Sequence, residues 1–274
     1  MTDLLKRTYS GAIYILVILA GVLIHPYVFA LVFSAALILL LNEFYTISKK
    51  CGAEPLKIPG IALGLFLFVL MFLYVAGMIA GGLILLAIPA IFLIFIFELY
   101  RKKEKPLINI AVTLTGFILI ALPVSLLNYF IFPGTENTRQ FYPWLLIGIF
   151  FILWSYDTAA YMVGMWAGKH RLFESISPNK SWEGVIGGAV IALIVGILNS
   201  VAFQSVNLTG WIAISLTIIV FGTFGDLIES MIKRSLNVKD TGTLLPGHGG
   251  LLDRLDSLLL SIPFIFAWLL IFNN

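Results

Sequence analysis

The sequence predicts an all-α integral membrane protein that crosses the bilayer about nine times. Of its 274 residues 60% are hydrophobic and only 11% are charged, whereas a soluble domain carries roughly 25% charged residues. Apolar runs of about 18 residues or more recur along the whole chain, as membrane-spanning helices require. These runs are continuous, which excludes the alternating segments of an outer-membrane barrel. A single cysteine, Cys51, excludes a disulfide framework or a thiolate metal site.

Charged residues, prolines and polar runs divide the chain into nine apolar segments. Each crossing needs about 20 apolar residues, and interruptions of this kind mark the loops between crossings. Only His25 and Pro26 separate the first two segments, and the first is short, so we expect residues 11–25 to form a partial or tilted span. The segments are 11–25, 27–47, 59–79, 81–99, 108–131, 144–166, 184–203, 211–232 and 252–272.

Lysine and arginine support this count because they collect in alternate loops. Sixteen of the 17 fall on one side, and Arg139 alone falls on the other. Positive charge is retained on the cytoplasmic side of a membrane. We therefore expect a cytoplasmic N-terminus, an external C-terminus and a cell-membrane protein whose active site faces the cytoplasm. From the first loop to the head of the last span, the sixteen are Lys6, Arg7, Lys49, Lys50, Lys57, Arg101, Lys102, Lys103, Lys105, Lys169, Arg171, Lys180, Lys233, Arg234, Lys239 and Arg254.

Two parts of the chain are expected to differ in role. Residues 1–140 are N-terminal membrane helices, suited to packing or to an oligomer interface, and residues 141–274 form a catalytic membrane domain with cytoplasmic loops at 167–183 and 233–251. Glycines spaced four apart, as at Gly60 and Gly64, permit close helix contact and so a homodimer. The same spacing occurs at Gly77/Gly81, Gly164/Gly168 and Gly184/Gly188.

Acidic residues within the apolar segments need an explanation, because each costs a few kcal/mol to insert. Glu43 and Glu98 lie near helix ends next to Lys49 and Arg101, and we interpret them as interfacial charges. Glu183 opens a span, where a first-turn acid favours the helix dipole. The other acids lie farther inside the spans; they are Asp157, Asp226, Glu229, Asp253 and Asp256.

The spacing of these acids favours a cation site. Asp226 is three or four residues before Glu229 and Ser230, and Asp253 is three residues before Asp256, which puts each set on one helix face. Two acids on one face repel each other unless a cation lies between them. Mg²⁺ binds one or two carboxylates together with substrate phosphates. The alternative is a set of buried salt bridges to Lys233, Arg234 and Arg254.

The two cytoplasmic loops add groups that bind phosphate. Residues 242–250 are rich in glycine, and their backbone N–H groups could form an anion-binding nest. The basic residues Lys233, Arg234, Lys239 and Arg254 surround this stretch and suit phosphate oxygens. The other loop contributes Lys169, Arg171, Ser177, Lys180 and Ser181. Carboxylates for a metal beside donors for phosphate indicate phosphoryl or nucleotidyl transfer rather than a proton relay.

Two stretches carry these groups in a recognisable order. Residues 230–256 read SMIKRSLNVKDTGTLLPGHGGLLDRLD, and upstream the chain reads DTAAY at 157–161 and ISPNKSWEG at 176–184. Both closely resemble the pattern of the phosphatidate cytidylyltransferases, also called CDP-diacylglycerol synthases. Asn179 and Ser181 stand where Lys and Thr are common in that family. The resemblance covers residues 150–260; residues 1–140 agree only in being hydrophobic helices.

The resemblance implies a reaction between CTP and phosphatidic acid that gives CDP-diacylglycerol and pyrophosphate, with Mg²⁺ and, in some members, a monovalent cation such as K⁺. It implies a metal site at Asp226, Asp253 and Asp256, with Glu229 and Ser230 beside it. The remaining groups would contact substrate: Lys233 and Arg234 in catalysis, with Lys239, Asp240, His248, Gly249, Gly250 and Arg254 around the triphosphate, and Asp157, Ser177, Lys180 and Ser181 on the opposing wall. We expect a phosphate or structural hydrogen bond from His248, because phosphatidate is already ionised and needs no strong base.

Two other functions remain open from the sequence. A CTP-dependent polyprenol or phytol kinase would also be polytopic and would use the same class of nucleotide. An ion-coupled transporter would place intramembrane acids along a path to the outer face, but the outer halves of the spans contain none. No nucleic-acid partner is expected.

Overall fold

The computed structural model describes residues 3–134, 140–244 and 249–272, with side chains from residue 9 onward. Eight helices in this part of the chain are long and apolar enough to cross a membrane, and a ninth apolar helix, Tyr9–Leu23, is shorter. The all-α polytopic architecture is thus confirmed. Whether residues 11–25 form a partial or tilted span stays a prediction.

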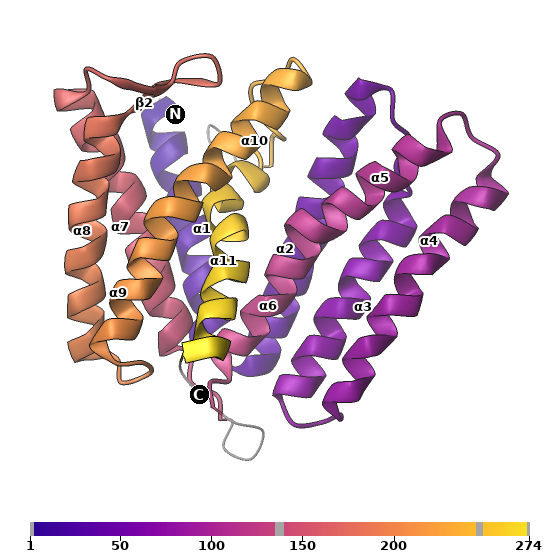
Figure 1. Cartoon of the computed structure of the whole chain (residues 1–274), viewed down its shortest axis with the longest axis horizontal. Helices are drawn as coiled ribbons and strands as arrows, with labels where there is room; N and C mark the ends of the chain where they lie inside the picture. Colours follow the sequence, from indigo (N-terminus) through magenta and orange to yellow (C-terminus); the bar gives the residue numbers. More distant parts are fainter. Residues whose placement is uncertain (1–2, 135–139, 245–248, 273–274) are drawn as a thin grey trace. The chain divides into compact units, whose positions relative to one another are not determined.

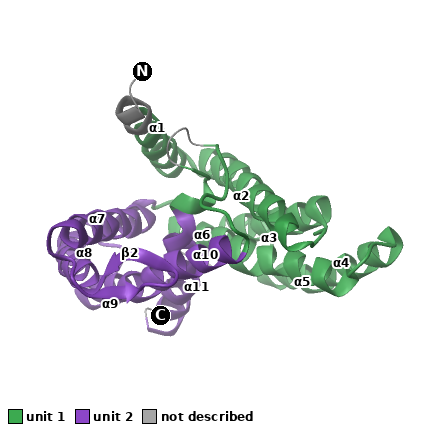
Figure 2. Ribbon diagram, turned by 90° about the horizontal axis from the view of Figure 1, so that it is seen from above, with its two compact units in different colours: residues 1–142, 236–254 green, residues 143–235, 255–274 purple. Residues whose placement is uncertain are grey.

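The chain divides into two compact units (Figure 2). Unit 1 contains residues 1–142 and 236–254, and unit 2 contains residues 143–235 and 255–274. The expected division into residues 1–140 and 141–274, with different roles, stays a prediction. The sequence did not predict that 236–254 groups with the N-terminal helices; a catalytic role confined to the C-terminal part stays a prediction.

Unit 1 consists of helices whose starts follow local sequence signals. Pro26 and Pro106 occupy first-turn positions, where a missing N–H costs nothing. The imidazole of His25 accepts a hydrogen bond from Tyr27 N (3.3 Å) and so begins a new helix after Leu23. In chain order the elements are α1 (Asp3–Leu23), α2 (Pro26–Ser48), η1 (Lys49–Cys51), α3 (Lys57–Val75), η2 (Gly81–Leu86), α4 (Ala87–Arg101), α5 (Pro106–Gly116), the π-helical η3 (Phe117–Ala121) and α6 (Leu122–Ile131).

Glycines bring the helices of unit 1 together around Tyr45. The Tyr45 hydroxyl donates to Thr113 O (2.9 Å), and a Cβ on Gly60 or Gly116 would come within 2.6 Å of the Tyr45 side chain. Gly64 likewise faces Leu41 and Ala121. Since Gly60 and Gly64 serve packing within the chain, their spacing no longer argues for a homodimer.

Basic loops of unit 1 meet at one end of its helices. Lys103 Nζ lies 3.0 Å from Glu54 Oε2, and Arg101 donates to Glu54 O (2.9 Å). The hydrogen bond from Lys103 holds the pKa of the Glu54 carboxyl below its ordinary value. The loops before α3 and after α4 therefore share one end, as the alternation of positive charge predicts.

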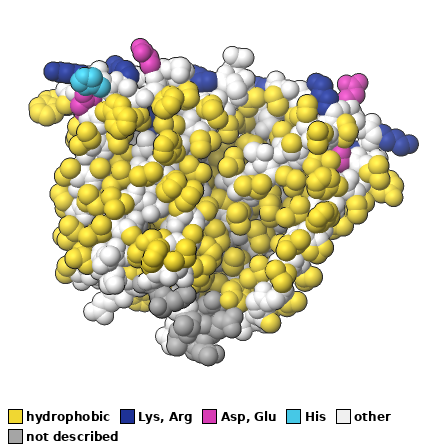
Figure 3. Space-filling view, in the orientation of Figure 1, with side chains coloured by type: hydrophobic (Ala, Val, Ile, Leu, Met, Phe, Trp, Pro, Cys, Tyr) yellow, Lys and Arg dark blue, Asp and Glu magenta, His cyan; other side chains and the backbone are white. Residues whose placement is uncertain are grey.

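Unit 2 contains four membrane-spanning segments and a β-hairpin. The hairpin joins α7 to α8 at the end of the unit where α10 stops and α11 starts (Figure 1). Charged side chains visible on this unit gather at that end, and hydrophobic ones cover its helices (Figure 3). The elements are α7 (Trp144–Ala167), β1 (Arg171–Phe173), β2 (Ser177–Ser181), α8 (Trp182–Ala202), α9 (Leu208–Thr217), the π-helical η4 (Ile218–Gly222), α10 (Thr223–Ser235) and α11 (Leu252–Phe272).

The hairpin is the main local feature that the sequence interpretation missed. Residues 167–183 were expected to form a loop, but β1 and β2 pair antiparallel, with Arg171 opposite Ser181 and Phe173 opposite Ser177. Behind it, a Cβ on Gly184 would fall 2.7 Å from Ala160 O. This close approach of α8 to α7 uses Gly184 within unit 2, so this glycine too is not evidence for a dimer.

Candidate functional site

Three carboxylates converge in unit 2. Asp226 and Glu229 of α10 and Asp256 of α11 each present an oxygen, and these oxygens lie within 4.8 Å of one another. Glu229 is buried and the two aspartates are half-buried. Ligands of an octahedral Mg²⁺ at about 2.1 Å are separated by roughly 2.9 to 4.2 Å. The all-oxygen donor set suits a hard divalent cation, and oxygens within 4.8 Å of one another need only small side-chain shifts to reach this spacing.

A close contact between two helices brings these acids together. A Cβ on Gly225 would fall 2.6 Å from Asp256 O, so the backbone of α10 passes directly against α11 at this point. Asp226 is the next residue of α10. The π-helical segment η4 ends at Gly222, four residues before Asp226, and such segments inside α-helices often occur at functional sites. Local backbone geometry therefore places Asp226 beside Asp256.

Two lysines contact the acidic cluster. Lys180 Nζ of β2 lies 2.5 Å from Asp226 Oδ2, and Lys233 Nζ lies 2.6 Å from Glu229 Oε2. Both lysines were predicted to bind phosphate or nucleotide, and the structure shows that they also balance the charge of the acids. Metal binding and salt bridges, treated above as alternatives, thus involve the same carboxylates.

Other predicted groups lie close to the same carboxylates. Ser230 Oγ donates to Asp226 Oδ1 (3.3 Å). Asp157, on α7, interacts electrostatically with Asp256, as do Asp226 and Lys180. Helices α7, α10 and α11 and strand β2 therefore each supply a predicted residue to one charged region of unit 2.

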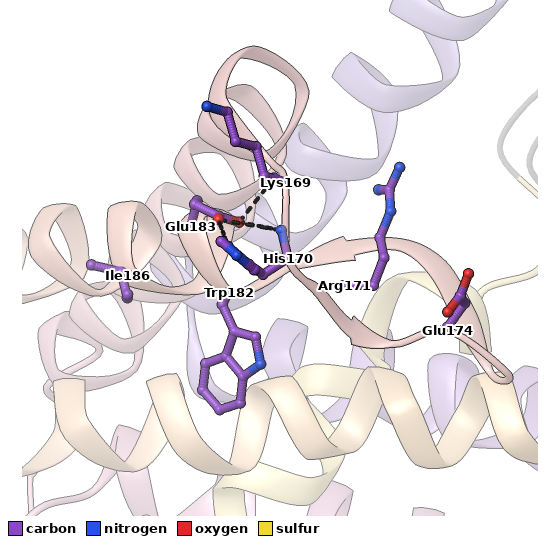
Figure 4. A pocket seen from close by; sticks show the side chains of 7 residues that line it. All are labelled: Lys169, His170, Arg171, Glu174, Trp182, Glu183 and Ile186. Carbon is purple, nitrogen blue, oxygen red and sulfur yellow. Dashed lines mark hydrogen bonds and ion pairs between the residues drawn. The ribbon is translucent and has the colours of Figure 1, made fainter.

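An open pocket of about 690 Å³ lies beside the hairpin (Figure 4). The carboxylate of Glu183 accepts hydrogen bonds from Lys169 N (3.1 Å) and His170 N (3.2 Å), and it lies 2.6 Å from His170 Nδ1. Glu183 is in the first turn of α8, as expected, but its contact with His170 was not predicted. The pocket is lined by Lys169, His170, Arg171, Glu174, Trp182, Glu183 and Ile186.

Ser181, a predicted substrate contact, caps α8. Its Oγ accepts from Gly184 N (3.1 Å), and its side chain is buried. Ser177, at the start of β2, is half-buried. A serine just before an apolar run is a common N-cap signal, so this role could have been recognised from the sequence.

The glycine-rich stretch belongs to unit 1, where Asp253 organises it. Asp253 Oδ2 accepts from Gly250 N (2.7 Å), Thr241 N (3.0 Å) and Thr241 Oγ1 (3.0 Å). Gly249 has a φ of 82°, which favours glycine. Among the described amides of 242–250, Gly250 N already donates to a carboxylate, and the anion-binding nest stays a prediction for the others.

The other predicted residues are described by the unit in which they lie and by their exposure. Asp253 lies in unit 1, and the three clustered acids lie in unit 2. His248 falls outside the described residues. The structure shows Arg234, Lys239, Asp240 and Arg254 as exposed.

Glu43 is the residue that the sequence interpretation placed wrongly. It was assigned as an interfacial charge near Lys49, but it is only 8% exposed. Its two oxygens accept from Leu251 N (3.0 Å) and Leu252 N (2.9 Å), the amides at the start of α11. These partners are more than 200 residues away in the chain, and no local pattern could have identified them. Glu98 is also buried, but it does contact Arg101, as expected (2.7 Å).

Comparison with known proteins gives a consistent set of relatives. A model of the cytidylyltransferase family matches residues 5–272. The phosphatidate cytidylyltransferase of Bacillus subtilis is 33% identical over 276 residues, which cover 100% of both chains. That of Haemophilus influenzae is 33% identical over 94% of this chain and 96% of its own, and that of Staphylococcus haemolyticus is 35% identical over 77% and 78%.

Proposed function

We propose that this chain, which belongs to the cytidylyltransferase family, transfers the cytidylyl group of CTP to phosphatidic acid and releases pyrophosphate. The relatives that match it from end to end bear the name of this activity. The observation that carries the proposal is the convergence of Asp226, Glu229 and Asp256 with two lysines in a membrane protein. This arrangement suits the joining of two polyanions beside a bilayer.

The proposed reaction does not need a strong general base. A phosphate monoester loses its second proton near pH 6, so the phosphatidate oxygen that attacks the α-phosphorus of CTP is already anionic. Catalysis then depends on holding the reactants in line and on stabilising negative charge. We assign Lys180 and Lys233 to this task, because each ammonium group lies at the acidic cluster and can hydrogen-bond phosphate oxygens.

We assign Mg²⁺ binding to Asp226, Glu229 and Asp256. When bound, a divalent cation neutralises charge on phosphate oxygens and orients them. Ser230 fixes one oxygen of Asp226 through its hydrogen bond. The carboxylates themselves hold the cation and act neither as nucleophile nor as base.

We propose that the hairpin end of unit 2 faces the cytoplasm, where CTP is present. Trp182 and Ile186 are more than half exposed beside Lys169 and Arg171. Aromatic and basic side chains are typical of the membrane interface, where basic residues attract anionic headgroups. This end of the unit suits the phosphate of a lipid that approaches along the membrane surface.

The test is incubation of the purified protein with phosphatidic acid, Mg²⁺ and CTP labelled at the α-phosphorus. Cytidylyl transfer moves the label into the lipid fraction as CDP-diacylglycerol. Label that remains in CDP would instead indicate a kinase and overturn the proposal. The Asp256→Asn variant serves as the control for background transfer.

A further inference from the structure

We propose that Glu43 is a positioning residue for cytidylyl transfer: its buried carboxylate holds both ends of the glycine-rich segment and the start of α11. The segment is defined here by its described residues, 241–244 and 249–252. The proposal rests on the function proposed above, since it concerns how the chain prepares that reaction. It assigns a catalytic purpose to a helix of the N-terminal part, α2, whose role the sequence left open.

Glu43 makes the contacts of a buried helix-capping carboxylate, and it is not a solvent-exposed interfacial charge. A buried carboxylate costs several kcal/mol unless its oxygens are hydrogen-bonded. Here Oε1 accepts from Leu251 N and Oε2 from Leu252 N. The first N–H groups of a helix have no partner inside the helix and lie at its positive end. Glu43 therefore caps α11 from a distant part of the chain.

The same carboxylate also contacts the other end of the segment. A Cβ on Gly242 would fall 2.7 Å from Glu43 Oε1, and a Cβ on Gly250 would fall 2.6 Å from Glu43 Oε2. Only glycine permits both approaches. Glu43 thus lies between the two ends of the segment, and the glycines are needed to admit it.

Glu43 and Asp253 work as a pair on this segment. Thr241 Oγ1 lies 3.0 Å from Asp253 Oδ2 and 3.5 Å from Glu43 Oε2, so its single proton favours Asp253. The two backbone amides that donate hydrogen bonds to Glu43 come directly after Gly250 in the chain. The amide of Gly250 itself donates to Asp253. Loss of the Glu43 contacts would therefore release the backbone that orients Asp253. Asp256 follows one turn later in α11.

The first test compares Glu43→Gln with Glu98→Gln. Glu98 is a matched control because it is a buried acid of unit 1 whose partners, Arg101 and Asn109, lie outside the segment. We expect Glu43→Gln to lower kcat/KM for CTP by about tenfold or more per folded enzyme, with Glu43→Asp recovering part of it. Glu98→Gln should change thermal stability and leave kcat/KM unchanged. Equal kcat/KM in Glu43→Gln and the wild type would overturn the proposal.

A second variant keeps the carboxylate and moves it. Gly242→Ala should push a methyl group against Glu43 and lower kcat/KM for CTP, whereas Gly82→Ala, where a Cβ meets nothing within 4 Å, should not. If Glu43→Gln does not fold, the comparison of Gly242→Ala with Gly82→Ala tests the positioning role of Glu43. Wild-type kinetics in Gly242→Ala would count against the anchor.

A third measurement does not depend on catalysis. We expect trypsin to cleave after Lys239, which is exposed just before the segment, faster in Glu43→Gln than in the wild type. Cleavage after Lys103 in the α4–α5 loop serves as the internal control. A wild type without transfer activity would defeat the proposed function alone, while unchanged cleavage after Lys239 would defeat the anchor alone.

Discussion

Asp256 is the carboxylate of α11 in the acidic cluster, and its substitution tests whether that cluster binds a cation. It lies with Asp226 and Glu229 in one group of carboxylate oxygens, and Asn has nearly the same shape without the charge. We expect Asp256→Asn to reduce cytidylyl transfer by about 100-fold or more. Its stability without metal should be equal or higher, because Asn removes a half-buried carboxyl that lies close to other carboxylates. The measurements are initial rate and thermal unfolding.

The opposite pattern would identify a structural role. If Asp256→Asn loses stability in proportion to its activity, the carboxylate serves a salt bridge and not a cation. Ser261→Ala is a suitable comparison, since Ser261 lies on the same helix and bonds only Ser257 O among the contacts described (2.7 Å).

Single residues also show how far the sequence alone can lead. The spacing of Asp226 and Glu229 on one helix face was readable, because helical periodicity fixes it. The N-cap of α8 could have been predicted, because Ser181 directly precedes an apolar run, although a substrate-binding role was preferred for it. The capping role of Glu43 could not be predicted, since its hydrogen-bond donors are amides 208 and 209 residues away.

At the scale of elements, the contact between α10 and α11 determines whether the acids converge. A Cβ on Gly225 would fall 2.6 Å from Asp256 O, whereas a Cβ on Gly222 meets only ordinary contacts of 3.5 Å or more. We expect Gly225→Ala to destabilise the protein by about 1–3 kcal/mol and to lower transfer activity. Gly222→Ala should do neither. Similar unfolding temperatures for the two variants would contradict the close approach.

The N-terminus of α8 gives a second prediction at this scale. Ser181→Ala removes an N-cap and should lower the free energy of unfolding by about 1 kcal/mol. Ser200→Ala, near the other end of the same helix, should stay within about 0.5 kcal/mol of the wild type. Thermal or denaturant unfolding in detergent measures both. An unfolding free energy for Ser181→Ala that equals that of Ser200→Ala would contradict the capping role.

Most elements followed from the sequence, and those that did not share a physical reason. Continuous apolar runs and the charges between them identified the spans, because the bilayer fixes their length and composition. The β1–β2 hairpin has only three- and five-residue strands, too short for a periodic pattern. The π-helical segments η3 and η4 lie inside apolar spans, where hydropathy does not distinguish one helix type from another.

At the scale of the whole molecule, the membrane orientation can be tested with the native cysteine. Cys51 is exposed at the basic end of unit 1. We expect a membrane-impermeant maleimide to label it in inverted vesicles and not in right-side-out vesicles. For unit 2, a cysteine at exposed Gln204, in the loop after α8, in a Cys51→Ser background should show the reverse. Labelling of both cysteines from the same side would contradict the orientation.

Direct measurement of cation binding at Asp226, Glu229 and Asp256 tests this site better than activity does. Electron paramagnetic resonance can follow the titration of the purified protein with Mn²⁺, which competes for the same oxygen ligands as Mg²⁺. We expect the wild type to bind Mn²⁺ that Mg²⁺ displaces, and we expect Asp256→Asn and Asp226→Asn both to lose this binding. Equal Mn²⁺ binding by the wild type and these two variants would contradict it.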